Sequence, residues 1–203
     1  MKKNNTLVTI TQTAIMAALC YVGFEFFQIP IPLPSGTTAF HLGNVFCVLA
    51  ALLLGGPYGG MAGAIGMTLA DLLDPRYITS APKTFVLKLG IGLICGLVAH
   101  RIGGITRAEE DGTPKPKKKI ALWCVLGCSA GLLFNIIFEP VVSYLYQRFL
   151  LGQAADAAMI LAKWQAVTTL VNAVIAVIVA TLLYMALHPA LDKAGVLRRN
   201  IRF

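Results

Sequence analysis

Six runs of apolar residues, separated by polar or glycine- and proline-rich links, make up most of this chain. A hydrocarbon core of about 30 Å is crossed by about 20 helical residues. The runs therefore predict transmembrane helices at about residues 8–29, 42–55, 58–73, 84–102, 120–147 and 158–187. We expect one all-α integral membrane domain over residues 1–203, built as a bundle of six transmembrane helices.

The links also carry information. Pro30 and Pro32 end the first run, and the proline-rich stretch 29–40 is expected to be a long loop. The second and third runs are short, and Gly55-Gly56-Pro57 separates them. Glycines allow helix backbones to approach closely, so a tight helical hairpin is expected there.

Composition supports the membrane assignment. Hydrophobic residues make up 57% of the chain, charged residues 13%, and the mean hydropathy is +0.75. A soluble domain is about 45–50% apolar and about 25% charged. The chain thus has too little polar surface for a water-facing globule. The five cysteines all lie within apolar runs, and we interpret them as packing residues; no metal site is expected.

The net charge of +8 reflects how the basic residues are placed. The N-terminal residues, the link 101–119 and the tail from residue 193 hold two, six and four of the seventeen Lys and Arg residues. Six crossings put all three on one side, which the positive-inside rule identifies as the cytoplasm. Both termini and the basic linker 103–119 are therefore expected to be cytoplasmic, and no nucleic-acid role is needed to explain the charge.

Ionisable groups inside a bilayer are costly and indicate function by default. Placed by depth along alternating helices, the strong polar groups converge on the extracellular half, above an almost apolar inner half. This pattern predicts a cup that opens outward and has a sealed floor. The candidate substrate-binding residues are His41, Asn44, Asp71, Thr84, Lys88, Asn135, Glu139, Trp164, Gln165 and Thr168.

Roles follow from side-chain chemistry. Lys88 and His41 suit oxygen or phosphate groups, Asp71 or Glu139 suits a ring nitrogen or amine, and Trp164 suits a planar ring. Alternatives stay open at this point. Asp71 and Lys88 could form a structural ion pair, and Trp164 could belong to the aromatic belt at the membrane surface. Glu25 and Lys163 could simply reach water at the interface.

Three classes of function remain for such a chain. It has no Gly-x-x-x-x-Gly-Lys-Ser/Thr loop and so does not hydrolyse ATP by that route. No catalytic residues can be assigned and no cofactor is expected, so an enzyme is the weakest interpretation. A substrate receptor fits the sealed cup. A self-sufficient ion-coupled secondary transporter, with Asp71, Lys88 and Glu139 as coupling groups, is the alternative.

The motifs His41-Leu-Gly-Asn44, Gly55-Gly-Pro-Tyr-Gly-Gly60 and Ala81-Pro-Lys-Thr84, with Asp71 and Lys88, resemble the substrate-binding S components of energy-coupling factor (ECF) transporters. The similarity is greatest to the riboflavin-type branch, which includes proteins assigned to pyridoxine and hydroxymethylpyrimidine. Nearly the whole chain takes part.

This resemblance implies a vitamin-binding subunit in the plasma membrane of a bacterium, with a membrane T subunit and two cytoplasmic ATPases as partners. It implies that Ala14 and Ala18 dock on the T subunit. It also implies that the loop 29–40 acts as a lid and that the protein topples in the membrane to release its substrate. The vitamin stays open among pyridoxine, hydroxymethylpyrimidine, riboflavin and other compounds.

Overall fold

The structure, a computed structural model, describes residues 2–107 and 115–194, apart from the side chains of residues 2–5. It contains the six predicted helices and a β-hairpin between the first two. The helices are α1 Lys2–Glu25, α2 Gly43–Leu54, α3 Gly56–Leu73, α4 Ala81–Gly96, α5 Lys117–Leu145 and α6 Ala155–Lys193, and the strands are β1 Gln28–Leu33 and β2 Gly36–His41. The middle of the predicted linker, 108–114, and the basic tail from residue 195 lie outside the described residues.

The helices differ from the predicted ranges mainly at their ends. α1 ends at Glu25 rather than residue 29, because the residues from Gln28 onward pair as a strand. α5 and α6 begin earlier than expected, and α6 runs on to Lys193. The apolar pattern marks only the part of a helix that lies in lipid, whereas Lys and Ala are also good helix formers in water. Short π-helical segments, Leu97–Ile102 and Tyr146–Leu150, extend α4 and α5.

Four helical stretches are long and apolar enough to cross a membrane: Thr6–Glu25, Ile78–Ile102, Lys117–Leu150 and Ala155–Lys193. The two remaining helices are shorter, with 12 residues in α2 and 18 in α3. α6 is the longest, and its 39 residues correspond to roughly 58 Å at 1.5 Å per residue. The molecule is therefore membrane-embedded, with two short helices packed among the long ones.

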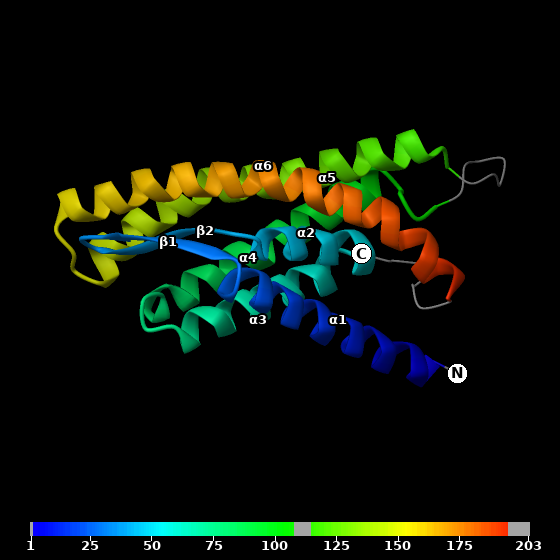
Figure 1. The fold of residues 1–203 in the computed structure, drawn as a ribbon, viewed down its shortest axis with the longest axis horizontal. Coiled ribbons are helices and arrows are strands. Elements are labelled where there is room, and N and C mark those ends of the chain that lie inside the picture. Colours follow the sequence, from blue (N-terminus) through cyan, green and yellow to red (C-terminus); the bar gives the residue numbers. More distant parts are fainter. Residues whose placement is uncertain (1, 108–114, 195–203) are drawn as a thin grey trace.

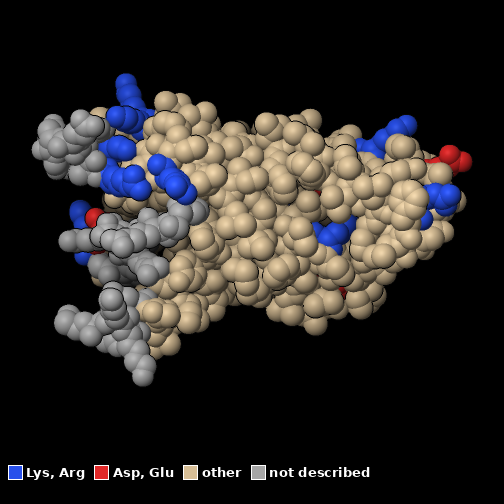
Figure 2. Space-filling model, turned by 180° about the vertical axis from the view of Figure 1, so that it is seen from behind, with Lys and Arg blue, Asp and Glu red and all other residues tan. Residues whose placement is uncertain are grey.

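All the helices lie roughly along the long axis of the molecule, as Figure 1 shows. The start of α1, the end of α4, the start of α5 and the end of α6 share one end, on the right of that view. The hairpin and the α5–α6 connection lie at the opposite end. In Figure 2, seen from behind, Lys and Arg side chains gather at the first end, and a broad uncharged belt separates them from the charged groups nearer the hairpin. This belt has the surface chemistry expected next to lipid.

The stretch 29–40, expected to be a loop, is instead a two-stranded antiparallel hairpin. Gln28 pairs with His41 and Leu33 with Gly36, so only Pro34 and Ser35 form the turn. Proline lacks an N–H, but Pro30 and Pro32 occupy alternate positions of β1. Alternate N–H groups of an edge strand point away from its partner, so the ladder survives.

Glycines bring α3 and α4 into backbone contact. A Cβ atom on Gly92 would lie 2.2 Å from the Cα atom of Gly60, and one on Gly96 would lie 2.2 Å from the backbone nitrogen of Gly56. No side chain fits at either position. Gly55, at the α2–α3 junction, has a φ of 88°, which glycine adopts without steric cost. A Cβ atom on Gly59 of α3 would likewise lie 2.2 Å from the Cα atom of Ala51 on α2, so the tight hairpin expected between α2 and α3 is present. The α3–α4 contact sets Asp71 beside α4.

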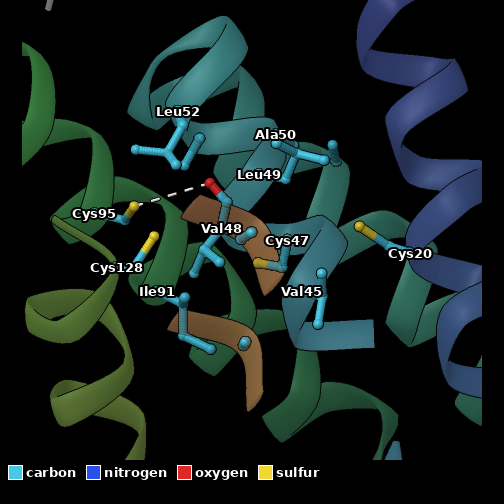
Figure 3. Packing of buried hydrophobic residues seen from close by; sticks show 14 of the residues in the cluster. Cys20, Val45, Cys47, Val48, Leu49, Ala50, Leu52, Ile91, Cys95 and Cys128 are labelled. Atoms are coloured by element: carbon cyan, nitrogen blue, oxygen red, sulfur yellow. Dashed lines mark hydrogen bonds between the residues drawn. The ribbon is translucent and has the colours of Figure 1, made fainter. Parts of the chain in front are cut away.

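An apolar core fills the half of the bundle nearer the basic end. Figure 3 shows Val48 and Leu52 of α2 facing Ile91 and Cys95 of α4, with Cys128 of α5 beside them. The Cys95 thiol points at the carbonyl oxygen of Val48, 3.9 Å away. All five cysteines are free and buried in this core, in accordance with their interpretation as packing residues.

Candidate functional site

A cavity lies in the half of the molecule opposite the basic end. The non-atom space within its walls and open mouth together is about 510 Å³. Every helix and the second strand contribute to its wall. The lining residues are Phe24, Thr37, Thr38, Ala39, His41, Asn44, Met67, Asp71, Tyr77, Ser80, Lys83, Thr84, Lys88, Glu139, Gln165, Thr168, Thr169 and Asn172.

Eight of the ten predicted binding residues line this cavity: His41, Asn44, Asp71, Thr84, Lys88, Glu139, Gln165 and Thr168. They come from β2 and from five helices, α2 to α6. Helical spacing accounts for the pairs on one helix, since residues three or four apart share a face. The structure thus brings together groups that are up to 127 residues apart in the chain (from His41 to Thr168).

The other two predicted residues lie elsewhere. Trp164 is 43% exposed and points away from the cavity wall, on the outside of α6. Asn135 is buried, one turn before Glu139 on α5, and both polar atoms of its amide lack a hydrogen-bond partner. Asn135 therefore extends the polar face of α5 below the cavity without lining it.

Other aromatic residues replace Trp164 in the wall. The rings of Phe24 and His41 have centroids 4.8 Å apart, and Phe24 meets Tyr77 edge to face at 5.4 Å. The Tyr77 hydroxyl donates to the Gln28 side-chain oxygen at 3.0 Å. Sequence reasoning missed Phe24 and Tyr77 because they lie at helix ends, where the apolar pattern gives no facing direction.

The main unpredicted element of the site is a buried ion pair. The Lys83 ammonium donates to the Glu139 carboxylate at 2.5 Å, and both side chains are almost fully buried. Lys83 was expected to precede the fourth helix, but α4 begins at Ala81 and carries Lys83 in its first turn. Because its partner is 56 residues away on α5, no local pattern could have revealed this pair.

Asp71 and Lys88 do not form the alternative structural ion pair. Among the described residues, ion pairs join Lys83 to Glu139 and Arg76 to Asp74 only. Asp71 instead lies beside Thr84 in the cavity wall, and its buried Oδ2 atom has no hydrogen-bond partner. Both side chains are buried, with Asp71 3% and Lys88 5% exposed.

Hydrogen bonds fasten the hairpin to α6 over the cavity. The Asn172 side chain accepts from the His41 N–H at 3.0 Å and donates to the Ala39 carbonyl at 3.1 Å. The hydroxyls of Thr38 and Thr168 lie 2.8 Å apart, and Ser35 donates to the Ala157 carbonyl at 2.7 Å. β2 is thus held as one wall of the site, whereas β1 is its exposed neighbour.

In the α3–α4 connection, the Arg76 backbone N–H and guanidinium donate four hydrogen bonds to the Asp74 carboxylate, and the two side chains form an ion pair. These hydrogen bonds hold the pKa of the Asp74 carboxyl below its usual value. Since the folded pKa is lowered, this small contribution to stability is present at neutral pH and is lost as the pH falls through the acidic range. Because the Arg76 side chain is exposed, solvent screens the ion pair and its contribution to stability is modest.

The chain's similarity to known proteins accords with this geometry. The model of the family described as ECF-type riboflavin transporter, S component, matches residues 4–189. The chain belongs to this family. A protein of Lysinibacillus sphaericus described as probable biotin transporter BioY is 30% identical over 148 residues, which are 72% of this chain and 68% of the relative.

A UPF0397 protein of Exiguobacterium is 28% identical over 197 residues, 96% of this S component and 97% of the relative. An uncharacterised protein of Pyrococcus woesei is 36% identical over 66 residues, 32% of this S component and 43% of its own length. No solved structure gives a significant match.

The remaining candidate positions of the S component lie on its surface. Ala14 and Ala18 are exposed on α1, whereas the neighbouring Ala17 is buried, with its carbonyl against Gly66 of α3. Lys163 lines an apolar surface groove between α5 and α6. Within the described ranges no group of His, Cys, Asp and Glu is placed to hold a metal ion.

Packed apolar residues of α2, α4 and α5, among them Val48, Ile91 and Cys128, lie between the cavity and the basic end. The sequence predicts an almost apolar inner half, but the buried His100 ring lies there, and its Nε2 atom contacts the Ala51 carbonyl at 3.1 Å. This contact satisfies one ring nitrogen and lies among packed helices.

Proposed function

We propose that this S component captures a small water-soluble vitamin or vitamin precursor outside a bacterial cell for ATP-driven uptake by partner subunits. The observation that carries the proposal is the cavity, which is polar, lined by charged and aromatic groups, and closed by the apolar core. A closed floor suits a receptor that binds and hands over its substrate. A channel needs polar groups along its whole length.

The eight lining residues predicted from the sequence, with Lys83, Tyr77 and Asn172, are the proposed contacts to the vitamin. The family's printed description points to riboflavin, and one relative's name to biotin. Both are heterocyclic vitamins, and the aromatic group of Phe24, His41 and Tyr77 offers ring faces for such a compound. Trp164, away from the cavity, is better suited to the aromatic belt.

The proposed partners are a membrane T subunit and two cytoplasmic ATPases. Ala14 and Ala18 are exposed small residues one helical turn apart, and such a surface lets another helix approach closely. Orientation follows the positive-inside rule, with the basic end in the cytoplasm and the hairpin outside. The hairpin then takes the role of the expected lid, because it borders the cavity and is fastened to α6 through side chains.

Mass spectrometry of small molecules that co-purify with the detergent-solubilised chain tests the proposal first. We expect one stoichiometric vitamin, and binding by the isolated chain that needs no ATP. In liposomes, uptake is expected only when the T subunit and both ATPases are present. Proton- or sodium-driven uptake by the chain alone would instead establish the secondary transporter.

Partner docking has its own test. Replacing Ala14 with Trp should abolish uptake by the assembled transporter and leave vitamin binding unchanged, because the residue is exposed and far along α1 from the cavity. Ile15→Trp, an enlargement on a neighbouring exposed position, is the matched control and should retain uptake. Equal loss of uptake in both variants would argue against docking at the alanines.

A further inference from the structure

Four residues that carry a formal charge at neutral pH line the cavity: Lys83, Lys88, Asp71 and Glu139. With two lysines and two carboxylates, their formal charges sum to zero. Lys83 and Glu139 neutralise each other through the buried ion pair at 2.5 Å. Lys88 and Asp71 therefore decide how the cavity responds to charge on a ligand.

These two residues are the unsatisfied members of the set. The Lys88 ammonium has no hydrogen bond or ion pair with any residue in the described part of the chain. Asp71 keeps one oxygen, Oδ2, without a partner although the side chain is 3% exposed. A buried charge is costly unless it is paired and hydrogen-bonded. Lys88 thus has an unused hydrogen-bond donor, and Asp71 has an unused acceptor.

We infer that the substrate carries no net charge and bridges these two residues, offering an electron-rich oxygen to Lys88 and an N–H or O–H donor to Asp71. This inference rests on the proposed function and specifies its substrate class. Such a molecule is a neutral or zwitterionic nitrogen heterocycle with hydroxyl or oxo groups. A carboxylate or phosphate would leave the filled cavity with a net negative charge, which a low-dielectric site disfavours.

Two side-chain amide groups add to the hydrogen-bonding groups that an uncharged polar substrate can use. The side-chain oxygens of Asn44 and Gln165 are buried and have no partner, and both residues line the cavity. With Asp71 they present three buried acceptor atoms without a partner, and each amide also carries an NH2 donor. The substrate is accordingly expected to offer hydrogen-bond donors, such as hydroxymethyl, amino or ring N–H groups, together with oxo or ring-nitrogen acceptors.

Matched compounds test the charge rule by calorimetry on the full chain in lipid nanodiscs. The pairs are pyridoxine with pyridoxine 5′-phosphate, riboflavin with riboflavin 5′-phosphate, and biotinamide with biotin. Whichever family of compounds binds, the uncharged member should bind at least about tenfold more tightly, the equivalent of roughly 1.4 kcal/mol. Equal or tighter binding of the anionic member would overturn the inference and leave the proposed function intact.

Charge-changing variants provide a second readout within the same protein. Asp71→Asn leaves the cavity one charge more positive, so the preference should move by at least about tenfold toward the anionic member of a pair. Lys88→Met should instead shift preference toward a cationic amine such as pyridoxamine over pyridoxine. The controls are Asp156→Asn and Lys163→Met, which change the same charges outside the cavity.

Ratios of affinities within one variant cancel any general loss of folded protein. Preferences that stay unchanged in both Asp71→Asn and Lys88→Met would overturn the inference. If no compound binds wild-type protein that unfolds cooperatively on heating, the proposed function itself fails, and this inference with it.

Discussion

At the scale of single residues, the ion pair between Lys83 and Glu139 dominates the interior of the site. The side chains of Lys83 and Glu139 are 4% and 11% exposed, and their contact of 2.5 Å offsets part of the cost of removing both charges from solvent. Removing one partner leaves the other buried and uncompensated, which typically costs about 3–5 kcal/mol. Replacing both with apolar residues of similar volume is often nearly neutral.

Lys83→Met should therefore lower the free energy of unfolding by about 3–5 kcal/mol, whereas Lys83→Met combined with Glu139→Leu should recover most of it. Thermal or denaturant unfolding in detergent measures both. Lys163→Met, on the surface groove, should change stability by less than about 0.5 kcal/mol. A double variant as unstable as Lys83→Met alone would contradict this account of the pair.

The sequence shows which residues are candidates for the site more readily than it shows the direction in which each side chain faces. Buried polar groups inside apolar runs, such as Lys88 and Glu139, stand out because they are costly in a membrane. Trp164 and Gln165 are adjacent, and successive residues on a helix point about 100° apart. Gln165 faces the cavity and Trp164 faces outward, a difference that depends on how α6 packs against its neighbours.

At the scale of elements, the hairpin was the least predictable part of the fold. Three prolines at positions 30, 32 and 34 indicate a loop when proline is counted only as a breaker of regular structure. The alternate spacing of Pro30 and Pro32 is compatible with an edge strand, because their missing N–H groups point away from β2, and Pro34 lies in the turn. Long-range bonds from β2 to α6 then select the strand over the loop, and no sequence pattern contains them.

Asn172 should control how firmly this hairpin is held. Asn172→Ala removes both bonds to the β2 backbone and leaves the His41 N–H without its partner, at a cost of about 1–3 kcal/mol. Hydrogen–deuterium exchange of residues 36–41 should then become faster, with the core of α2 unchanged. Asn135→Ala is the control, since Asn135 forms no bond to the hairpin; equal exchange in the two variants would exclude Asn172 as the anchor.

The α3–α4 contact is a second element-scale feature, because it sets Asp71 relative to Lys88. Gly92→Ala would place its Cβ 2.2 Å from the Cα of Gly60, so the two helices must separate. Overpacking of this kind typically costs about 1–3 kcal/mol. We expect both a lower unfolding temperature and weaker vitamin binding, measured by thermal shift and calorimetry. Wild-type affinity in Gly92→Ala would show that the site tolerates a shift of α4.

At the scale of the whole molecule, the distribution of charge makes a prediction about orientation. The start of α5 carries Lys117, Lys118 and Lys119. It lies at the same end of the molecule as the start of α1 and the ends of α4 and α6, and the cavity lies toward the other end. Bacterial membrane proteins keep Lys and Arg in short cytoplasmic segments. We therefore expect the cavity to face the outside, as the proposed capture of a vitamin requires.

Cysteine labelling in intact cells tests this orientation with little background, since all five native cysteines are buried. Asp156→Cys, exposed at the start of α6, should react with a membrane-impermeant maleimide, and Lys118→Cys, exposed at the start of α5, should react only after the cells are opened. The reversed pattern would put the cavity in the cytoplasm and make an exporter or a cytoplasmic receptor the better account. Labelling as expected would tie the charged cavity to external solute, because the apolar core then separates it from the cytoplasm.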